Sequence, residues 1–174
     1  MSRRLRPPLV LAWGANLVTG TTIAGDPDLL HVNLPDGFRL DALVLTAYAA
    51  LDNLGFIAVQ AGPIWTEGLG GAINPANLLG WSHFGPGNGT VGTDILDNMG
   101  LGAGAIGFTP PLLAGDYTFL IQQTGGAGIN YTFDYFTAVP LPASAWMGLA
   151  VLGACGVFAR VRRRRRVASP LPPH

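Results

Sequence analysis

The sequence predicts an all-β fold, an antiparallel β-sandwich, followed by a single C-terminal transmembrane helix and an Arg-rich tail. The chain has 174 residues, among them 25 Gly and 14 Pro, and these residue types mark turns. Between the turns, short segments alternate apolar and polar side chains with the period of a β-strand. Near the C-terminus, an uncharged apolar run is followed directly by arginines. We therefore expect a β-sandwich domain over residues 1–138, a transmembrane helix over 143–159 and a cytoplasmic tail over 160–174.

The N-terminal segment PLVLAWGANLVTGTTI (residues 8–23) has two interpretations. Basic residues followed by an apolar stretch are typical of an export signal, but the stretch Leu9–Ala15 is at the lower end of the length range for such signals. We favour the second interpretation, in which the segment forms the first hairpin of the β domain. A signal peptide would then lie upstream of Met1.

Two adjacent segments, DLLHVNL and FRLDALVLTAY, predict strands on either side of a turn. In the first, Leu30, Val32 and Leu34 face inward while His31 and Asn33 face outward. The second begins with the same alternation and becomes continuously apolar, as expected of a strand that enters a two-sided core. Between them, Pro35-Asp36-Gly37 predicts a tight turn, because Pro presets φ and Gly supplies a positive φ.

Further segments predict the second half of the domain. GFIAVQA (55–61) and LLGWSHFG (78–85) are expected to be strands, and TDILDNMG (93–100) one or two helical turns capped by Thr93. In GDYTFLIQQTGGAGINYTFDYFTAV (115–139), apolar residues alternate on both sides of a glycine-rich turn, which predicts a hairpin. At least seven short strands without strand–helix–strand alternation favour an antiparallel sandwich.

The framing of these strands resembles a known class of bacterial domain. The stretches GDPDLLHVNLPDGFRLDALVLTAY, AGDYTFLIQQTGG and YTFDY are similar to domains of the bacterial pre-peptidase C-terminal type. The resemblance implies a jelly-roll-like sandwich with an accessory role in binding, spacing or surface attachment. Such domains usually carry an aromatic residue where Leu29 or Leu30 stands in this chain.

Charged residues are segregated along the chain. All ten acidic residues lie between Asp26 and Asp134, and Arg39 is the only basic residue in that range. An acidic surface repels phosphate backbones, so we expect no nucleic-acid partner. The only cysteine, Cys155, lies in the C-terminal apolar run. The domain therefore has no disulfide, thiol nucleophile or thiolate metal site.

The apolar run Ala143–Ala159 carries no charge. As a helix of about 17 residues it would extend about 26 Å, the short end of a bilayer span. Trp146 near its start suits the interfacial position that aromatic residues prefer. The arginine block after the run comprises Arg160, Arg162, Arg163, Arg164, Arg165 and Arg166. Because Arg-rich flanks stay on the cytoplasmic side, we expect the N-terminus outside and the C-terminus inside.

A pentapeptide stands directly before this run: Val139, Pro140, Leu141, Pro142 and Ala143. Its prolines fix φ and remove backbone donors, which keeps the segment extended, as a protease cleft requires. The order of VPLPA, apolar run and arginine block resembles the PEP-CTERM sorting signals of bacteria, in the VPLPA variant. The resemblance covers residues 139–166 and implies cleavage by an exosortase, a membrane-embedded cysteine protease. The tail continues as VASPLPPH, longer than is usual for the family.

Three other interpretations of the C-terminal segment were weighed. A buried core helix is disfavoured because the adjacent arginines could not follow it into a core. A nucleic-acid tail is disfavoured because the arginine block abuts a membrane-grade apolar run. A plain membrane anchor is the strongest alternative, and an intact rather than cleaved C-terminus would distinguish it.

Catalytic motifs in the domain are weak, so we expect no enzyme and no cofactor. The stretch 102–107 matches G-x-G-x-x-G, but the following Phe-Thr-Pro-Pro blocks the helix that a dinucleotide site needs, so a glycine-rich loop is expected. Ser82 and His83 are neighbours, yet no nucleophile-elbow motif surrounds Ser82. We expect His83 to be a strand or rim residue.

Two weaker possibilities concern metal and sugar binding. Paired carboxylates occur at Asp26/Asp28, Asp36/Asp41 and Asp94/Asp97. Without an EF-hand or a repeat to support a Ca²⁺ site, we interpret them as solvated turn residues and expect no metal. Trp65, in the turn-rich stretch GPIWTEGLGG with Glu67 and Asn74 nearby, is either a sugar-stacking platform in an exposed loop or a lid on one end of the sandwich.

Together these observations predict a non-enzymatic, exported protein of the cell surface or extracellular matrix. Exosortase is its expected sorting partner, the membrane its partner in transit, and exopolysaccharide a further candidate. The alternative is a permanently membrane-anchored module that binds a carbohydrate or protein ligand.

Overall fold

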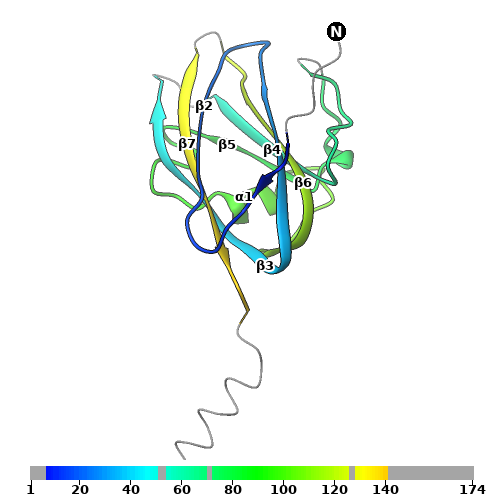
Figure 1. Cartoon of the computed structure of the whole chain (residues 1–174). Coiled ribbons are helices and arrows are strands. Elements are labelled where there is room, and N and C mark those ends of the chain that lie inside the picture. Colours follow the sequence, from blue (N-terminus) through cyan, green and yellow to red (C-terminus); the bar gives the residue numbers. More distant parts are fainter. Residues whose placement is uncertain (1–6, 51–53, 70–71, 126–127, 141–174) are drawn as a thin grey trace, which may run out of the picture. The chain divides into compact units, whose positions relative to one another are not determined.

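The computed structural model describes residues 7–50, 54–69, 72–125 and 128–140. Within them lie seven β-strands, one short α-helix and one 3₁₀ turn (Figure 1). In chain order the elements are β1 (Leu9–Val10), β2 (Leu17–Thr22), β3 (Asp28–Ala49), β4 (Gly55–Ala61), η1 (Pro75–Asn77), β5 (Gly80–Phe84), α1 (Leu96–Gly100), β6 (Leu112–Gln123) and β7 (Ile129–Ala138). The expected membrane segment and arginine block lie outside these residues.

The strands pair in the order β2, β7, β3, β6, β4, β5, and β1 lies parallel to β3. Every pair in the main order is antiparallel. One layer of the sandwich holds β2, β7 and the second half of β3, and the other holds the first half of β3 with β6, β4 and β5. The prediction of an all-β, mostly antiparallel sandwich is confirmed, and the expected strands at 55–61 and 78–85 are β4 and β5.

Strand β3 joins the two layers. Residues 28–34 pair with β6, residues 39 and 40 pair with both β6 and β7, and the rest of the strand to Ala49 pairs with β7 alone. The register with β6 shifts between Leu34 and Arg39, and Gly37 has a φ of 80° there, which a glycine adopts at little cost. The expected turn at Pro35-Asp36-Gly37 is therefore a bend within one strand rather than a break between two (Figure 1).

The hairpin expected over residues 115–139 is wrong. β6 pairs with β3 and β4, and β7 pairs with β2 and β3, so the two strands belong to different layers. The rings of Phe119 in β6 and Tyr135 in β7 meet at right angles with centroids 5.2 Å apart, across the core. Alternation identifies the face that each strand buries, but it does not identify the neighbouring strands. Here β6 and β7 bury their apolar faces in the same core from opposite sides.

The hairpin expected over residues 8–23 is also wrong, although the segment does belong to the domain. β1 pairs with the first half of β3, and β2 pairs with β7. The connection between them is held by Asn16, which exchanges hydrogen bonds with the main chain of Ala12 and donates to the Tyr135 carbonyl at 2.9 Å. The N-terminal segment thus crosses from one layer to the other.

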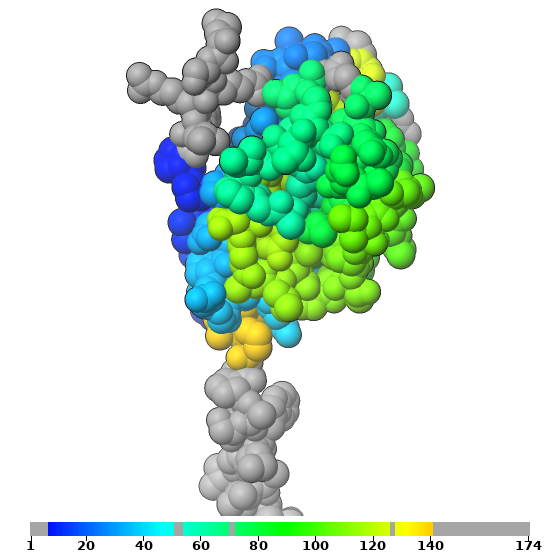
Figure 2. Space-filling view, turned by 90° about the vertical axis from the view of Figure 1, so that its right-hand side faces the viewer, coloured from blue at the N-terminus to red at the C-terminus, as the bar shows by residue number. Residues whose placement is uncertain are grey.

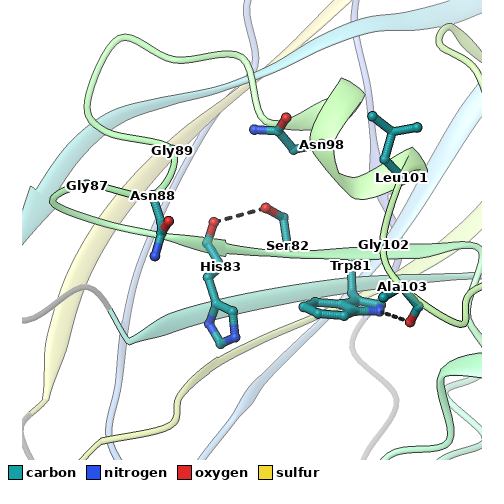
Figure 3. A pocket seen from close by; sticks show the side chains of 10 residues that line it. All are labelled: Trp81, Ser82, His83, Gly87, Asn88, Gly89, Asn98, Leu101, Gly102 and Ala103. Carbon is teal, nitrogen blue, oxygen red and sulfur yellow. Dashed lines mark hydrogen bonds between the residues drawn. The ribbon is translucent and has the colours of Figure 1, made fainter.

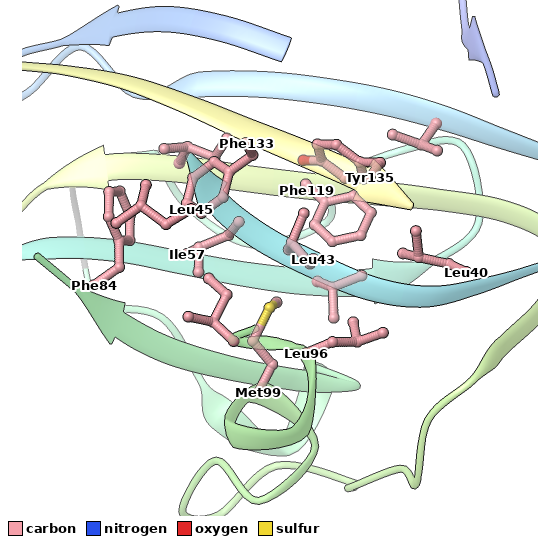
Figure 4. Close-up of a cluster of buried hydrophobic side chains, with 14 of the residues drawn as sticks. Leu40, Leu43, Leu45, Ile57, Phe84, Leu96, Met99, Phe119, Phe133 and Tyr135 are labelled. Carbon is pink, nitrogen blue, oxygen red and sulfur yellow. The ribbon is translucent and has the colours of Figure 1, made fainter. Parts of the chain in front are cut away.

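Buried aromatic and aliphatic side chains from both layers form one core (Figure 4). Phe133 in β7 lies edge-on to Phe84 in β5, with centroids 5.0 Å apart. The residues that are fully buried in this core include Leu43, Leu45, Ile57, Val59, Phe84, Ile95, Leu96, Met99, Phe119, Ile121, Phe133 and Tyr135. The inward positions expected for Val32 and Leu34 are confirmed, and Leu30 is partly buried against the core.

Helix α1 closes the core beside the second half of β3 through Leu96 and Met99. The expected cap by Thr93 is wrong, since the Thr93 hydroxyl lies against that of Thr90 at 3.3 Å. Instead, Asp94 accepts hydrogen bonds from the Leu96 amide at 3.0 Å and from the Leu43 amide at 2.9 Å. One carboxylate therefore ties the start of the helix to β3.

By its contacts the chain divides into two units, residues 1–139 and 140–174. The last strand of the first unit ends at Ala138. Among the described residues, no helix is long and apolar enough to cross a membrane. The segment 143–159, where a membrane helix is expected, lies outside that description.

Replacing Phe133 by Ala should lower the free energy of unfolding by about 3–5 kcal/mol, because it leaves a cavity in a closely packed core. Phe136→Ala is the matched control, since this ring lies on the outward face of the same strand and is 44% exposed. It should cost far less. Urea unfolding followed by tryptophan fluorescence measures both, and equal losses for the two variants would contradict the inward position of Phe133.

Candidate binding site

Three rings gather on the outward side of the layer that contains β4 and β5. Phe56 and Trp81 stack with centroids 5.7 Å apart and planes at 29°. His83 meets both rings edge-on, 5.6 Å from Phe56 and 5.9 Å from Trp81. All three side chains are half-buried. We call Phe56, Trp81 and His83 the aromatic cluster.

The pleat and register of β4 and β5 create this cluster. Alternate residues of a strand face opposite sides, so Trp81 and His83 project to one side of β5 and Ser82 to the other (Figure 3). Phe56 pairs with His83 in the β4–β5 register, and Ala58 pairs with Trp81. The small side chain of Ala58 leaves room for the indole to lean toward Phe56.

Two hollows open beside the aromatic cluster. The smaller has a volume of about 310 Å³ and is lined by Phe56, Ile73, Pro75, Leu78, Trp81, His83, Gln122 and Thr124. The larger has a volume of about 450 Å³ and is lined by Trp81, Ser82, His83, Gly87, Asn88, Gly89, Asn98, Leu101, Gly102 and Ala103 (Figure 3). Trp81 and His83 contribute to the lining of both hollows, and their rings project from the face of β5 opposite to Ser82 (Figure 3).

The loop between β4 and β5 builds one wall of the smaller hollow (Figure 2, blue-green). It is pinned to the sheet by the buried Gln60 of β4. The Gln60 amide donates to the Thr66 hydroxyl at 3.1 Å and to the Asn77 carbonyl at 3.0 Å, and its oxygen accepts from the Thr66 amide at 3.0 Å. These bonds satisfy a buried polar side chain and hold Pro75 and Leu78 beside Trp81.

Glu67 holds the tip of the same wall. Its carboxylate accepts from the Asn74 amide at 2.9 Å and from the Asn77 side chain at 2.7 Å. The Asn74 hydrogen bond, followed by that of Asn77, keeps the pKa of this carboxyl below its ordinary value, because both donors favour the charged form. The wall is therefore stabilised when Glu67 is ionised.

The glycine-rich stretch 102–107 is a loop, as expected, and through Gly102 and Ala103 it builds a wall of the larger hollow. The Trp81 indole N–H donates to the Ala103 carbonyl at 3.1 Å. A Cβ on Gly102 would lie 2.7 Å from the Trp81 carbonyl oxygen and 2.9 Å from its nitrogen, so glycine is required for this close approach. The Ile106 amide donates to the Leu78 carbonyl at 3.0 Å and joins the two walls.

The polar groups of the site are neutral hydrogen-bonding groups. His83 Nδ1 lies 3.2 Å from the Gly55 carbonyl oxygen, and a carbonyl only accepts. Nδ1 is therefore the donor of this hydrogen bond, which leaves Nε2 as the ring nitrogen open to another partner. The Ser82 hydroxyl donates to the main-chain carbonyl of His83 at 3.0 Å. The amides of Gln122, Asn88 and Asn98 add donors and acceptors to the two hollows.

The structure places Trp65 differently from the exposed platform considered from the sequence. The side chain is half-buried, and its indole nitrogen is buried without a hydrogen bond. It lies in the pinned loop between Gln60 and Asn77, and it does not line either hollow.

The carboxylate pairs do not come together as a metal site. Asp28 accepts from the Tyr131 hydroxyl at 2.8 Å, Asp41 pairs with Arg39 at 2.7 Å, and Asp94 binds main-chain amides. No group of three or more His, Cys, Asp or Glu side chains that could hold a metal ion occurs in the described part of the chain. The carboxylates with these contacts support the fold.

Of the sorting residues, Val139 and Pro140 are described, and both are exposed directly after β7. Leu141, Pro142 and Ala143 lie outside the described residues, as do Trp146 and the arginine block.

Comparison with known proteins finds no matching family model, no matching curated protein and no matching solved structure.

The aromatic cluster was missed from the sequence. The available signal was the spacing of Trp81 and His83, two residues apart in an expected strand, which puts both rings on one face. Phe84, the next residue, is fully buried, so the face of Trp81 and His83 had to point away from the core. The contribution of Phe56 depended on the β4–β5 register, which the sequence does not state.

Acid should weaken the wall around Glu67. A carboxyl whose pKa is lowered by folding stabilises the fold above its unfolded pKa, about 4.3, and this contribution is lost as the pH falls through the lower folded pKa. Asn77→Ala removes one donor and should raise the pKa of Glu67 toward its ordinary value, as measured by carboxyl ¹³C NMR titration. Asn98→Ala, on the other wall, should leave that pKa unchanged. A Glu67 pKa that is the same in Asn77→Ala and in the parent would exclude the contact.

Proposed function

We propose that this chain is an exported, non-enzymatic protein of the cell surface or extracellular matrix, with a jelly-roll-like sandwich and a C-terminal signal that an exosortase cleaves. The observation that carries the proposal is a coincidence of boundaries. The last strand ends at Ala138, the first unit of the chain ends at Val139, and the VPLPA motif begins at Val139. The motif therefore starts where the folded domain ends.

This boundary suits proteolytic sorting. Ala138 is the last β7 residue in the ladder with β3, where it pairs with Arg39, and the next two residues are exposed. A protease that binds an extended segment can reach the chain there without unfolding a strand. Cleavage near Pro142 would leave all seven described strands with the released domain.

The charge pattern supports the proposed topology. An apolar run of bilayer length precedes six arginines, and such arginines stay in the cytoplasm. The acidic β domain would then be on the outer side of the inner membrane during transit and at the cell surface or in the matrix after cleavage. This location is consistent with the proposed association with exopolysaccharide.

The Ser82–His83 geometry supports a non-enzymatic role. The two side chains lie on opposite faces of β5 (Figure 3). Ser82 Oγ donates to a main-chain carbonyl, and the His83 ring contacts the Gly55 carbonyl. A nucleophile and its base must share a hydrogen bond, and these two groups bond to the main chain instead.

The second candidate function is a permanently anchored binding module. The aromatic cluster and its two hollows favour it, because a concave site with rings and neutral polar groups is typical of ligand binding. In this alternative the apolar run stays attached and the domain presents the hollows from the membrane surface. The state of the C-terminus separates the two functions.

Intact-mass spectrometry of the protein from its native producer tests the proposed sorting. We expect a mass that lacks the apolar run and the arginine block. A double Pro140→Ala/Pro142→Ala variant should retain the tail and collect in the membrane fraction, because the extended motif is lost.

The chain contains its own control for this experiment. Pro170-Leu171-Pro172 repeats the Pro-Leu-Pro pattern beyond the arginines, so Pro170→Ala/Pro172→Ala should be processed like the parent. A parent protein that keeps residues 160–166 would contradict cleavage and leave the anchored module as the function.

A further inference from the structure

We propose that the aromatic cluster and the two hollows beside it bind a neutral glycan, with a pyranose ring stacked against Trp81. The proposal concerns the ligand of the domain and does not depend on how the C-terminus is processed.

The shape of the aromatic cluster fits a sugar ring. Pyranose rings have apolar C–H faces and polar hydroxyl edges, so they bind where an aromatic face lies next to hydrogen-bonding groups. Phe56 and Trp81 stack with their planes at 29°, and both line the smaller hollow. Gln122 and Thr124 line the same hollow. A volume of about 310 Å³, next to another of about 450 Å³, lies within the roughly 300–1,000 Å³ of ligand sites.

The hydrogen-bonding groups match sugar hydroxyls. A hydroxyl both donates and accepts, and the amides of Gln122, Asn88 and Asn98 can do the same. Nε2 of His83 adds an acceptor within the aromatic cluster, because Nδ1 is committed to the Gly55 carbonyl. The ligand can therefore exchange its bonds to water for bonds to the protein.

The electrostatics select a neutral ligand. Among the residues that the structure describes, neither hollow is lined by Asp, Glu, Lys or Arg, so none of them offers a cation to pair with a carboxylate or phosphate on the ligand. Between Asp26 and Asp134, ten acidic residues stand against Arg39 alone, and this field repels an acidic polymer. An uncharged glycan has no anionic group that would need a cation, and the acidic residues of the domain do not repel it.

The rings are held in place before a ligand arrives. The Trp81 indole N–H is bonded to Ala103, and the His83 ring is bonded to Gly55. Both walls are tied together by the bond between Ile106 and Leu78. Little side-chain freedom is lost on binding, which favours affinity.

A peptide that adds a strand to β5 is the competing occupant, and the walls oppose it. β5 pairs with β4 on one side only. On its other side Gly102 packs so closely against the main-chain N and O of Trp81 that a Cβ there would lie within 3 Å of both. An added strand needs those two groups, and the glycine-rich loop covers them.

The full chain, purified in mild detergent, can be titrated with neutral oligosaccharides (cello-, malto- and mannooligosaccharides) and with an acidic one, an oligogalacturonate. Isothermal calorimetry and Trp fluorescence report binding. We expect at least one neutral series to bind and the oligogalacturonate not to bind. Trp81→Ala should weaken binding by about tenfold or more, the scale of one lost aromatic contact, and Trp81→Phe should restore part of it.

Two controls separate binding from folding. Trp13→Ala removes a tryptophan that is 74% exposed and lines neither hollow, so it should bind like the parent. Gln122→Ala removes a polar group without disturbing the ring stack, and it should weaken binding at an unchanged urea midpoint. The proposal is overturned if no neutral series binds, if the oligogalacturonate or a peptide binds instead, or if folded Trp81→Ala and Gln122→Ala bind as the parent does.

Discussion

The bend of β3 between Leu34 and Arg39 is the constraint on which the rest of this structure depends. One continuous strand pairs with β6 up to Leu40 and with β7 from Arg39 onward, so backbone hydrogen bonds and the chain itself hold the two layers together. The apolar faces of β6 and β7 then meet in the core, as the contact between Phe119 and Tyr135 shows. The N-terminal segment is a second backbone connection between the layers, since β1 pairs with β3 and Gly14 exchanges hydrogen bonds with Thr137 of β7.

The outer faces of the two layers carry different kinds of side chain. On the outer face of β2 and β7, threonine and asparagine side chains bond to one another, as in the pairs Thr19–Thr132 and Thr21–Asn130. The face of β4 and β5 instead carries stacked rings between two walls. Fold stability does not require aromatic surface in an open hollow, and concave aromatic surface of this kind is typical of binding sites. This difference between the two faces is why we propose the ligand site on the face of β4 and β5.

Sequence patterns predicted the strands better than their partners. β4 was predicted with its observed bounds because GFIAVQA is a mostly apolar segment between turns. Both expected hairpins failed because alternation reports only which face is buried, while pairing depends on contacts between distant segments. For the site, Trp81 and His83 could be placed on one face from their spacing. Phe56, the pinned loop of Gln60 and the close approach of Gly102 follow from register and loop packing, which local sequence does not encode.

Backbone nuclear Overhauser effects between strands test the central claim most directly, since that claim is the division of the chain by one bent strand. The account predicts cross-strand contacts from residues 28–34 to β6 and from residues 39–49 to β7 in the same molecule, with β5 contacting β4. Direct backbone contacts between β6 and β7, as in a hairpin, would contradict it. Such contacts would remove the basis for placing Phe133 inside the core and Trp81 outside it.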